Sequence, residues 1–291
     1  MPAALVNEFE TERPHLLAVA YRMLGSRAEA EDVVQEAWLR YDRARVGGDE
    51  IRDVRGWLTT VTGRICLDVL KSARVRREAY PGQWLPEPVV SPQEDPAEQV
   101  AQRQEVSLAL LVVLEKLTPE QRVAVVLHDA FAVPFEEIAE VLGTSVAAAR
   151  QHASRGRKAT AEGQARHTAD VAEQRRVLNA FLAAAASGDL RTLAAVLAPD
   201  VVAISDGGGV VSAGRNPVHG ADKVARFVVG LLTRKARNVT VEPVLVNGAA
   251  GVVVRGDAFA VMTAVVTDDG RIAALYSQLN PAKLTSVGDG R

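Results

Sequence analysis

The sequence has one cysteine, few aromatic residues and no long apolar run. Cys66 is the only cysteine among 291 residues, which excludes an internal disulfide bond and suits a reducing compartment. We interpret Cys66 itself as a small residue of a helix core. Apolar runs such as residues 180–186 and 123–127 are far shorter than the roughly 18 residues of a membrane span. Acidic residues stand where a signal peptide would be basic. These absences favour a cytoplasmic protein that does not enter a membrane.

The sequence also lacks an excess of charge of either sign. It has 34 Lys and Arg residues against 36 Asp and Glu residues, for a net charge of −2, which argues against strong unspecific binding of nucleic acid. The charges are nevertheless unevenly placed. Residues 64–77 and residues 150–166 each contain five basic residues and one acidic residue, whereas residues 29–36 are acidic. This pattern indicates local phosphate contacts in a protein that needs a larger partner on DNA.

Helical periodicity dominates the first half of the chain, and a proline-rich segment interrupts it. We predict helices at about 9–24, 26–41 and 53–77, with Ser26 and Glu29 forming a capping box. Five prolines then break any helix between residues 80 and 97, and we expect an extended, exposed linker there. Helices return at 98–117, 119–129, 134–142 and 145–162. The predicted helical domains therefore span residues 1–79 and 98–165.

The last third of the chain has a different pattern. After the polar residues 163–170, two helices at about 171–187 and 189–197 precede runs of β-branched residues, with another helix at about 221–232. The predicted strands are residues 201–205, 239–246, 251–254, 258–267 and 272–279. Residues 170–291 are therefore expected to form an α+β domain of ordinary size.

A helix-turn-helix is predicted at about residues 134–158. Ala139 is small where two helices must approach, Gly143 suits a left-handed helix end, and Ser145 can cap the second helix. The second helix presents small or basic residues, as a helix in the major groove requires. An ordinary helical hairpin with a solvated basic face is the alternative. The expected DNA-facing residues are Ser145, Ala147, Ala148, Arg150, Gln151, Ser154, Arg155 and Lys158.

Three motifs stand in order along the chain: residues 31–40, residues 54–77, and residues 117–122 followed by the helix-turn-helix. Together they resemble the extracytoplasmic-function (ECF) sigma factors of bacterial RNA polymerase. Residues 31–40 (EDVVQEAWLR) resemble the region 2 segment that docks on a coiled coil of the polymerase β′ subunit. Residues 54–77 resemble the part that recognises and opens the −10 element. Residues 117–122 (LTPEQR) and the helix-turn-helix resemble region 4, which reads the −35 element. The resemblance covers residues 8–160 and implies that core RNA polymerase, including its β subunit, and promoter DNA are partners.

The residues themselves agree with these roles. An acidic amphipathic helix suits a basic partner surface, and the implied polymerase contacts are Asp32, Gln35, Glu36 and Trp38. Trp38 could equally be a core residue. The basic end of the third helix suits the phosphates of a melted strand, with Arg64, Lys71, Arg74, Arg76 and Arg77 as the implied −10 contacts. In both places a solvated charged face is the alternative.

Three signatures stand outside these regions: Trp84-Leu85-Pro86, Asp206-Gly207-Gly208-Gly209 and Asn280-Pro281-Ala282-Lys283-Leu284. Together they resemble the ECF41-type subgroup of this family, which implies that the C-terminal extension is a built-in regulator. A basic residue often follows the glycines in that subgroup, whereas Val210 stands here. Taken singly, the glycine segment could be a hairpin turn and Asn280-Pro281 a turn near the chain end. Our hypothesis is that the linker around Leu85 lies against the extension.

The expected architecture is multidomain, with all-α σ2 and σ4 domains followed by an α+β NTF2/SnoaL-like cone. The function is then promoter-specific initiation without catalysis, cofactor or metal; the five histidines are scattered. A ligand-sensing helix-turn-helix regulator that acts without core polymerase is one alternative. A SnoaL-like enzyme is another, with Asp206, His219, Asp222 and Tyr276 as acid–base candidates. A small ligand in the last domain stays open, and an anti-sigma protein is neither required nor excluded.

Overall fold

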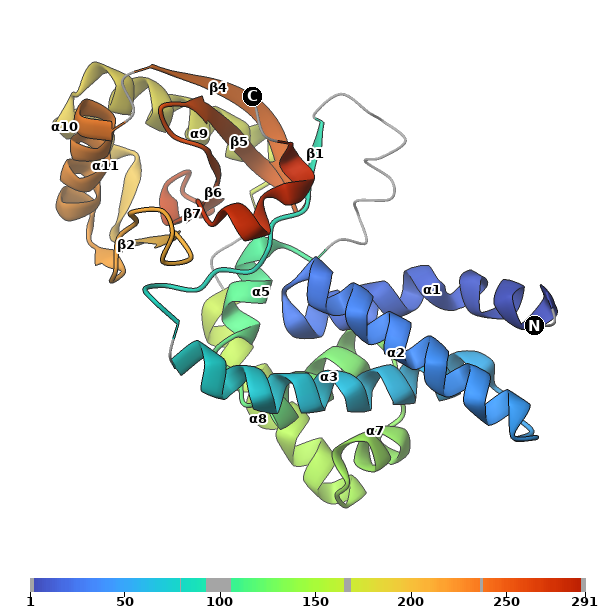
Figure 1. Ribbon diagram of the computed structural model, residues 1–291. Helices are drawn as coiled ribbons and strands as arrows, with labels where there is room; N and C mark the ends of the chain where they lie inside the picture. Colours follow the sequence, from blue (N-terminus) through green and yellow to red (C-terminus); the bar gives the residue numbers. More distant parts are fainter. Residues whose placement is uncertain (1–2, 79, 93–105, 165–168, 236–237, 289–291) are drawn as a thin grey trace. The chain divides into compact units, whose positions relative to one another are not determined.

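The computed structural model describes residues 3–78, 80–92, 106–164, 169–235 and 238–288 (Figure 1). The chain divides into two compact units. Unit 1 consists of residues 1–78 and 111–163, and unit 2 consists of residues 79–110 and 164–291. In the part of the chain that is described, no helix is long and apolar enough to span a bilayer.

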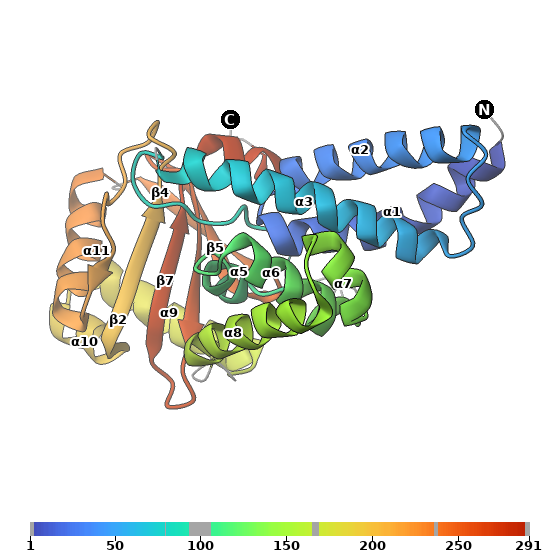
Figure 2. The same ribbon diagram turned by 90° about the horizontal axis from the view of Figure 1, so that it is seen from below.

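Unit 1 begins with three long helices that lie side by side (Figure 2). They are α1 (Ala3–Leu24), α2 (Arg27–Val46) and α3 (Val54–Glu78). Gly25 adopts a φ of 67° after α1, and the Ser26 hydroxyl accepts the Glu29 N–H at 3.3 Å, so the predicted helix boundary is confirmed. The helices enclose a core that contains Phe9, Leu16, Val34, Tyr41 and Leu58. Cys66 is fully buried in α3, as expected, and burial raises the pKa of its thiol.

Shorter helices complete unit 1. They are α5 (Leu108–Leu114), α6 (Pro119–Val125), the π-helical turn η1 (Val126–Ala130), α7 (Phe135–Leu142) and α8 (Val146–Gln164). Thr118 and Gln121 form a reciprocal capping box at the start of α6. Of the predicted helix at 98–117, the structure describes α5, which residues 106 and 107 precede without helical structure; residues 98–105 lie outside the described residues.

Unit 2 is built on a mixed sheet with the strand order β1-β4-β5-β6-β7-β2-β3. Its strands are β1 (Val90–Pro92), β2 (Leu197–Asp206), β3 (Val218–His219), β4 (Val239–Val246), β5 (Ala249–Gly256), β6 (Ala260–Val266) and β7 (Ile272–Gln278). Strand β2 runs parallel to β7, and the other neighbours are antiparallel. This pairing places the end of β2, at Asp206, beside the end of β7, at Gln278.

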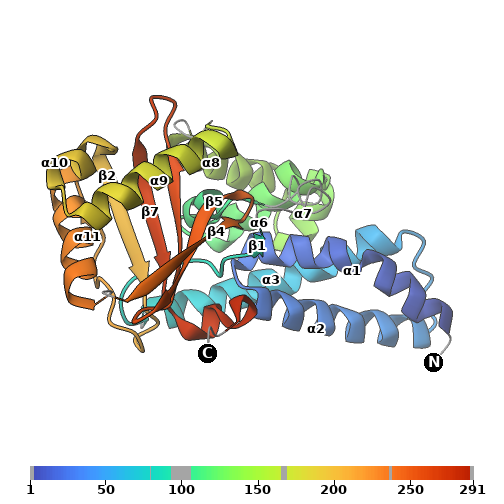
Figure 3. The ribbon, with the colours of Figure 1, turned by 90° about the horizontal axis from the view of Figure 1, so that it is seen from above.

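Three helices cover one face of this sheet (Figure 3). They are α9 (Val171–Ser187), α10 (Leu190–Ala195) and α11 (Ala221–Lys235). Phe181, Leu193, Val201 and Leu275 are among the buried residues of the core between helices and sheet. After β7 the chain forms two short 3₁₀ turns, η2 (Pro281–Lys283) and η3 (Thr285–Val287). The predicted α+β character of this part of the chain is confirmed.

The expectation of an exposed linker is wrong for residues 85–88, which are buried in unit 2. Leu85 is only 1% exposed, and the linker then forms β1, which pairs Val90 with Val246 of β4. Prolines exclude a helix, but they permit an extended chain and an edge strand, where a missing N–H is tolerated. Residues 93–97 of the predicted linker lie outside the described residues.

Candidate functional site

The helix-turn-helix is built by the residues that the sequence singled out. Gly143 ends α7 in the left-handed region at φ 62°, and its N–H donates to the carbonyl oxygens of Ala139 and Glu140. The Ser145 hydroxyl then accepts the Ala148 N–H at 3.2 Å at the start of α8. Ala139, where the helices approach, is buried. The turn between the two helices therefore satisfies its own backbone groups.

The outer face of α8 carries the predicted DNA contacts. Ala148 is half-buried, and the others are exposed: Ser145, Ala147, Arg150, Gln151, Ser154, Arg155 and Lys158. Arg150 lies 3.6 Å from the Glu136 carboxylate and 5.6 Å from the ring centroid of Phe135, both on α7. Because this pair is exposed, it contributes little to stability, and Arg150 can exchange it for a phosphate or base.

The acidic face of α2 is exposed at two of its four predicted positions. Asp32 and Gln35 are exposed, and Glu36 is partly covered through an ion pair with Arg40 at 2.8 Å. Trp38 lies with its ring centroid 4.9 Å from that of Phe9 and packs against the core of unit 1. Of the two interpretations of Trp38, core residue and contact anchor, the structure shows the packing of a core residue.

The predicted −10 residues on α3 are described only in part. Arg64 and Lys71 are exposed, whereas the side chains of Arg74, Arg76 and Arg77 lie outside the described residues. Arg64 is 3.7 Å from the Glu140 carboxylate of α7. Nearby, a Cβ added at Gly63 would lie 3.3 Å from Leu127 and Val141, which shows how closely α3 approaches the helix-turn-helix. The two DNA-binding halves expected from the sequence are thus packed together within unit 1.

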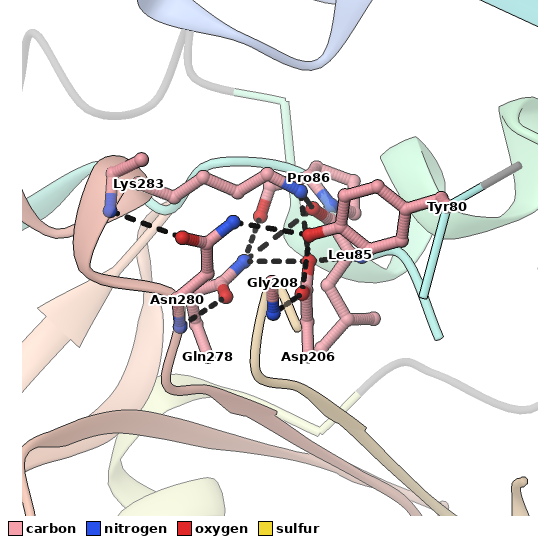
Figure 4. Close-up of polar contacts among 9 residues, drawn as sticks. Tyr80, Leu85, Pro86, Asp206, Gly208, Gln278, Asn280 and Lys283 are labelled. Carbon is pink, nitrogen blue, oxygen red and sulfur yellow. Dashed lines mark hydrogen bonds and ion pairs between the residues drawn. The ribbon is translucent and has the colours of Figure 1, made fainter. Parts of the chain in front are cut away.

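In unit 2, the three C-terminal and linker signatures meet at one buried carboxylate (Figure 4). Asp206 is 0% exposed. One of its oxygens accepts the Tyr80 hydroxyl at 2.7 Å and the Gly208 N–H at 2.9 Å. The other accepts the Leu85 N–H at 2.9 Å and the Lys283 ammonium at 2.7 Å. A buried carboxylate is costly unless it is paired and hydrogen-bonded, and this one takes two of these four partners from the linker.

Lys283 holds the same segment by three kinds of contact. Its ammonium donates to the Leu85 carbonyl oxygen at 2.6 Å, in addition to the Asp206 ion pair. It also lies 4.1 Å from the ring centroid of Trp84 and 5.3 Å from that of Tyr80, within the range of cation–π attraction. Its side chain is 12% exposed, so these contacts act with little screening by water. Burial, followed by the hydrogen bond to Asp206, raises the pKa of Tyr80.

The glycine segment has a steric reason for its composition. Gly208 and Gly209 have positive φ angles of 64° and 73°. A Cβ at Gly208 would lie 2.4 Å from the Asn280 side chain, and one at Gly209 would lie 2.5 Å from Pro81 of the linker. Asn280 in turn donates to the Tyr80 hydroxyl at 3.0 Å and accepts the Ala282 N–H. Val210, which replaces a basic residue common in the subgroup, is 78% exposed.

Two residues of this cluster had no signal in the sequence. Tyr80 stands at the border of the proline-rich segment, and Gln278 lies within the predicted strand 272–279. Gln278 donates to the Pro86 carbonyl oxygen at 3.3 Å and accepts the Asn280 N–H at 3.1 Å. Pro281 lies in the turn η2 and Leu284 is 1% exposed, so they shape the segment that carries Lys283. The cluster is therefore larger than its three signatures.

The acid–base candidates of the enzymatic alternative have other surroundings. Asp206 is engaged by the linker, and Asp222 is exposed on α11, 3.7 Å from Arg226. His219 is exposed on β3, whereas Tyr276 is buried on β7, where burial raises its pKa to about 12. Among the described residues there is no group of three or more His, Cys, Asp or Glu residues that could hold a metal ion.

Comparison with known proteins assigns the chain to a family. The sigma-70 region 2 family matches residues 9–76, and the sigma-70 region 4 family matches residues 107–159. The chain is 46% identical to the ECF RNA polymerase sigma factor SigJ of Mycobacterium tuberculosis, over 96% of this chain and 93% of SigJ. The chain belongs to the ECF sigma factors. This sigma factor is also 37% identical to the probable ECF sigma factor SigI of the same species, over 95% of this chain.

The structural comparison agrees with this assignment. The crystal structure of SigJ from Mycobacterium tuberculosis superposes with a TM-score of 0.76 and 44% identity, and covers 96% of this sigma factor and 98% of SigJ. The predicted order of fold classes is confirmed: helical region 2 and region 4 domains precede an α+β domain. The predicted function as an alternative sigma factor that directs transcription is likewise confirmed at the level of the family.

Proposed function

We propose that this sigma factor brings core RNA polymerase to promoters with two separate DNA-reading surfaces, and that unit 2 restrains it by holding residues 80–92. The observation that carries the proposal is that the backbone of Leu85 donates a hydrogen bond to Asp206 and accepts one from Lys283. The proposed polymerase contact is the acidic face of α2, on the β′ coiled coil. The proposed DNA contacts are the basic end of α3 at the −10 element and the outer face of α8 at the −35 element.

The length of the segment that joins region 2 to region 4 indicates that unit 2 lowers promoter binding while it holds this segment. The sequence that joins region 2 to region 4 includes residues 80–92, which are held along unit 2. Thirteen fully extended residues span at most roughly 45 Å. While residues 80–92 are bound to unit 2, they cannot contribute this length to the separation of region 2 from region 4. Regions 2 and 4 are packed together in unit 1, whereas the two promoter elements require them apart. Release of the linker should therefore favour promoter binding.

Run-off transcription with purified core enzyme and a cognate promoter tests this function. Lys283→Met keeps the apolar stem but removes the ammonium from Asp206 and Leu85, so we expect more transcript than from the native chain. Asp206→Asn should act in the same direction. Lys223→Met, at an exposed position of α11, is the matched control and should change nothing. The regulatory part is wrong if Lys283→Met and Asp206→Asn both give the native amount of transcript.

The same preparation tests the main function against the alternative of an autonomous regulator. We expect initiation only when core enzyme is present, and no specific gel shift of the promoter by the sigma factor alone, because its two basic segments lie on an acidic background. A specific shift without core enzyme, together with no core-dependent transcript, would favour the regulator. We also propose that the protein acts without catalysis, since the buried Asp206 carboxylate is occupied by linker groups.

A further inference from the structure

The turn between β4 and β5 is unusual because its first residue is buried. Asn247 and Gly248 have positive φ angles of 50° and 74°, and an Asn-Gly pair is well suited to such a two-residue hairpin turn. The tip of a hairpin usually faces solvent. Asn247, however, is only 3% exposed. A polar side chain in this position must find partners within the protein, and its partners are backbone groups of the linker and of the residue that precedes region 4.

The carboxamide of Asn247 binds two points that are well separated along the chain. Its Oδ1 accepts the Val89 N–H at 3.0 Å, and its Nδ2 donates to the Val106 carbonyl oxygen at 3.0 Å. The backbone N–H of Asn247 also donates to the Val89 carbonyl oxygen at 2.8 Å. Val89 immediately precedes β1, and Val106 is the residue before Ser107, whose hydroxyl accepts the Leu110 N–H at the start of α5. One side chain thus joins the entrance and the exit of the segment between them.

We propose that Asn247 is a positioning residue that holds Val89 and Val106 at one turn of unit 2, and so fixes the residue that precedes the region 4 match. This inference rests on the proposed function, because it supplies a second anchor for the linker whose release would favour transcription. The anchor is separate from the Asp206 cluster, since none of the hydrogen bonds described for Asp206 and Lys283 involves Val89, Val106 or Asn247. The Asp206 cluster holds the linker at Leu85, and Asn247 holds it at Val89, together with Val106 just before region 4.

The residue type is explained by three requirements that Asn meets together. The position needs a positive φ, an acceptor for Val89 and a donor for Val106. Glycine keeps the positive φ and lacks both side-chain groups. Aspartate tolerates the positive φ and keeps an acceptor, but it places a carboxylate oxygen against the Val106 carbonyl oxygen. We call the two side-chain hydrogen bonds of Asn247, to Val89 and to Val106, the clamp. Glycine keeps the turn but removes the clamp, and aspartate keeps the bond to Val89 but removes the bond to Val106.

Residue-resolved hydrogen–deuterium exchange of the full-length chain tests the clamp. In Asn247→Gly we expect the Val89 amide to exchange about tenfold faster, a factor of the size that one buried hydrogen bond contributes. The Leu110 amide should also exchange faster, whereas the Leu85 amide, bound to Asp206, should keep its native rate. In Asn247→Asp only the Leu110 amide should accelerate. Asp189→Ala, which removes the N-cap of α10 away from the linker, is the control for general loosening of unit 2.

The outcomes separate this inference from the function on which it rests. Native exchange at Val89 and Leu110 in Asn247→Gly would overturn the clamp, and so would equal acceleration at Leu85. Transcription by the same variant should rise as it does for Lys283→Met. If exchange changes as expected but neither variant alters the transcript, the clamp stands and the regulatory function fails. If only Lys283→Met alters the transcript and exchange in Asn247→Gly is native, the clamp fails alone.

Discussion

The guanidinium of Arg122, in α6, donates a hydrogen bond of 3.0 Å to the backbone carbonyl oxygen of Met23, near the end of α1. Arg122 is 3% exposed and also pairs with Glu115. Burial lowers the pKa of Arg122 to about 9, so the group remains protonated at neutral pH. Met23 belongs to the region 2 match and Arg122 to the region 4 match, so this buried cation joins the two halves of unit 1.

Replacing Arg122 by methionine should loosen that junction. The substitution leaves Glu115 without its buried cation, and breaking a buried pair typically costs roughly 3 kcal/mol. We expect a corresponding fall in the free energy of unfolding, measured by urea denaturation of the full chain. Arg150→Met is the matched control, because its partner Glu136 is exposed and the pair contributes less than about 1 kcal/mol. Equal losses in the two variants would contradict the structural role of Arg122.

Two helix glycines should respond in opposite directions to alanine. A Cβ at Gly156 of α8 would lie 2.5 Å from Val125, so Gly156→Ala should destabilise the protein by about 1 to 3 kcal/mol. Gly230 of α11 has nothing within 4 Å of an added Cβ, so Gly230→Ala should stabilise it by about 0.5 to 1 kcal/mol. Thermal unfolding of the two variants measures both signs. Stabilisation by Gly156→Ala would show that α6 and α8 are not in close contact.

The stability of unit 1 should decrease in mild acid because of His15. Burial, and then the charges of Arg55 and Arg22, lower the pKa of His15 below its ordinary 6.5. The folded form thus binds a proton less readily than the unfolded chain, so stability is highest above pH 6.5 and falls as the pH drops below it. His15→Gln should flatten this decline in urea unfolding midpoints measured between about pH 5 and pH 7.5. An unchanged pH profile would assign the decline to other groups.

Lys158 and Gln151 should contribute differently to promoter binding by the holoenzyme. A phosphate contact by Lys158 predicts that Lys158→Ala weakens binding at all promoters and reduces the salt slope by about one. A base contact by Gln151 predicts that Gln151→Ala changes the preference among −35 sequences and leaves the slope unchanged. Binding of holoenzyme to promoter variants over a salt series measures both. Lys116→Ala, exposed outside the helix-turn-helix, is the control, and an effect of equal size there would contradict the assignment.

The sequence predicted those features that depend on local backbone chemistry. Gly143 and Ser145 lie where the turn of the helix-turn-helix requires them, and Ser26 caps α2 as expected. Helix ends of this kind can be predicted from the sequence because a single residue satisfies the backbone groups of its neighbours. The proposed DNA and polymerase contacts stay predictions, since exposure of a side chain does not identify its partner.

The features that sequence reasoning missed depend on contacts between distant segments. Strand β1 has three residues and contains Pro92, so no periodicity could reveal it. Asn247 could be predicted as a turn residue, but nothing local indicates that Val89 and Val106 are its partners. Tyr80 likewise acquires its role only from the Asp206 carboxylate, which lies far away along the chain. The resemblance to a subgroup pointed to Asp206 and Lys283, whereas the burial of the Asp206 carboxylate and its ion pair with Lys283 are visible only in the fold.

The pairing of β1 with β4 affects association between molecules as well as the regulation of transcription. While Val90–Pro92 occupy the edge of the sheet, the adjacent backbone groups of β4 have partners (Figure 1). If the linker is released, that side of Val244–Val246 becomes an open strand edge, which can pair with a strand from another molecule. In the released form that we propose, this edge would therefore be a site at which two copies of the sigma factor can associate.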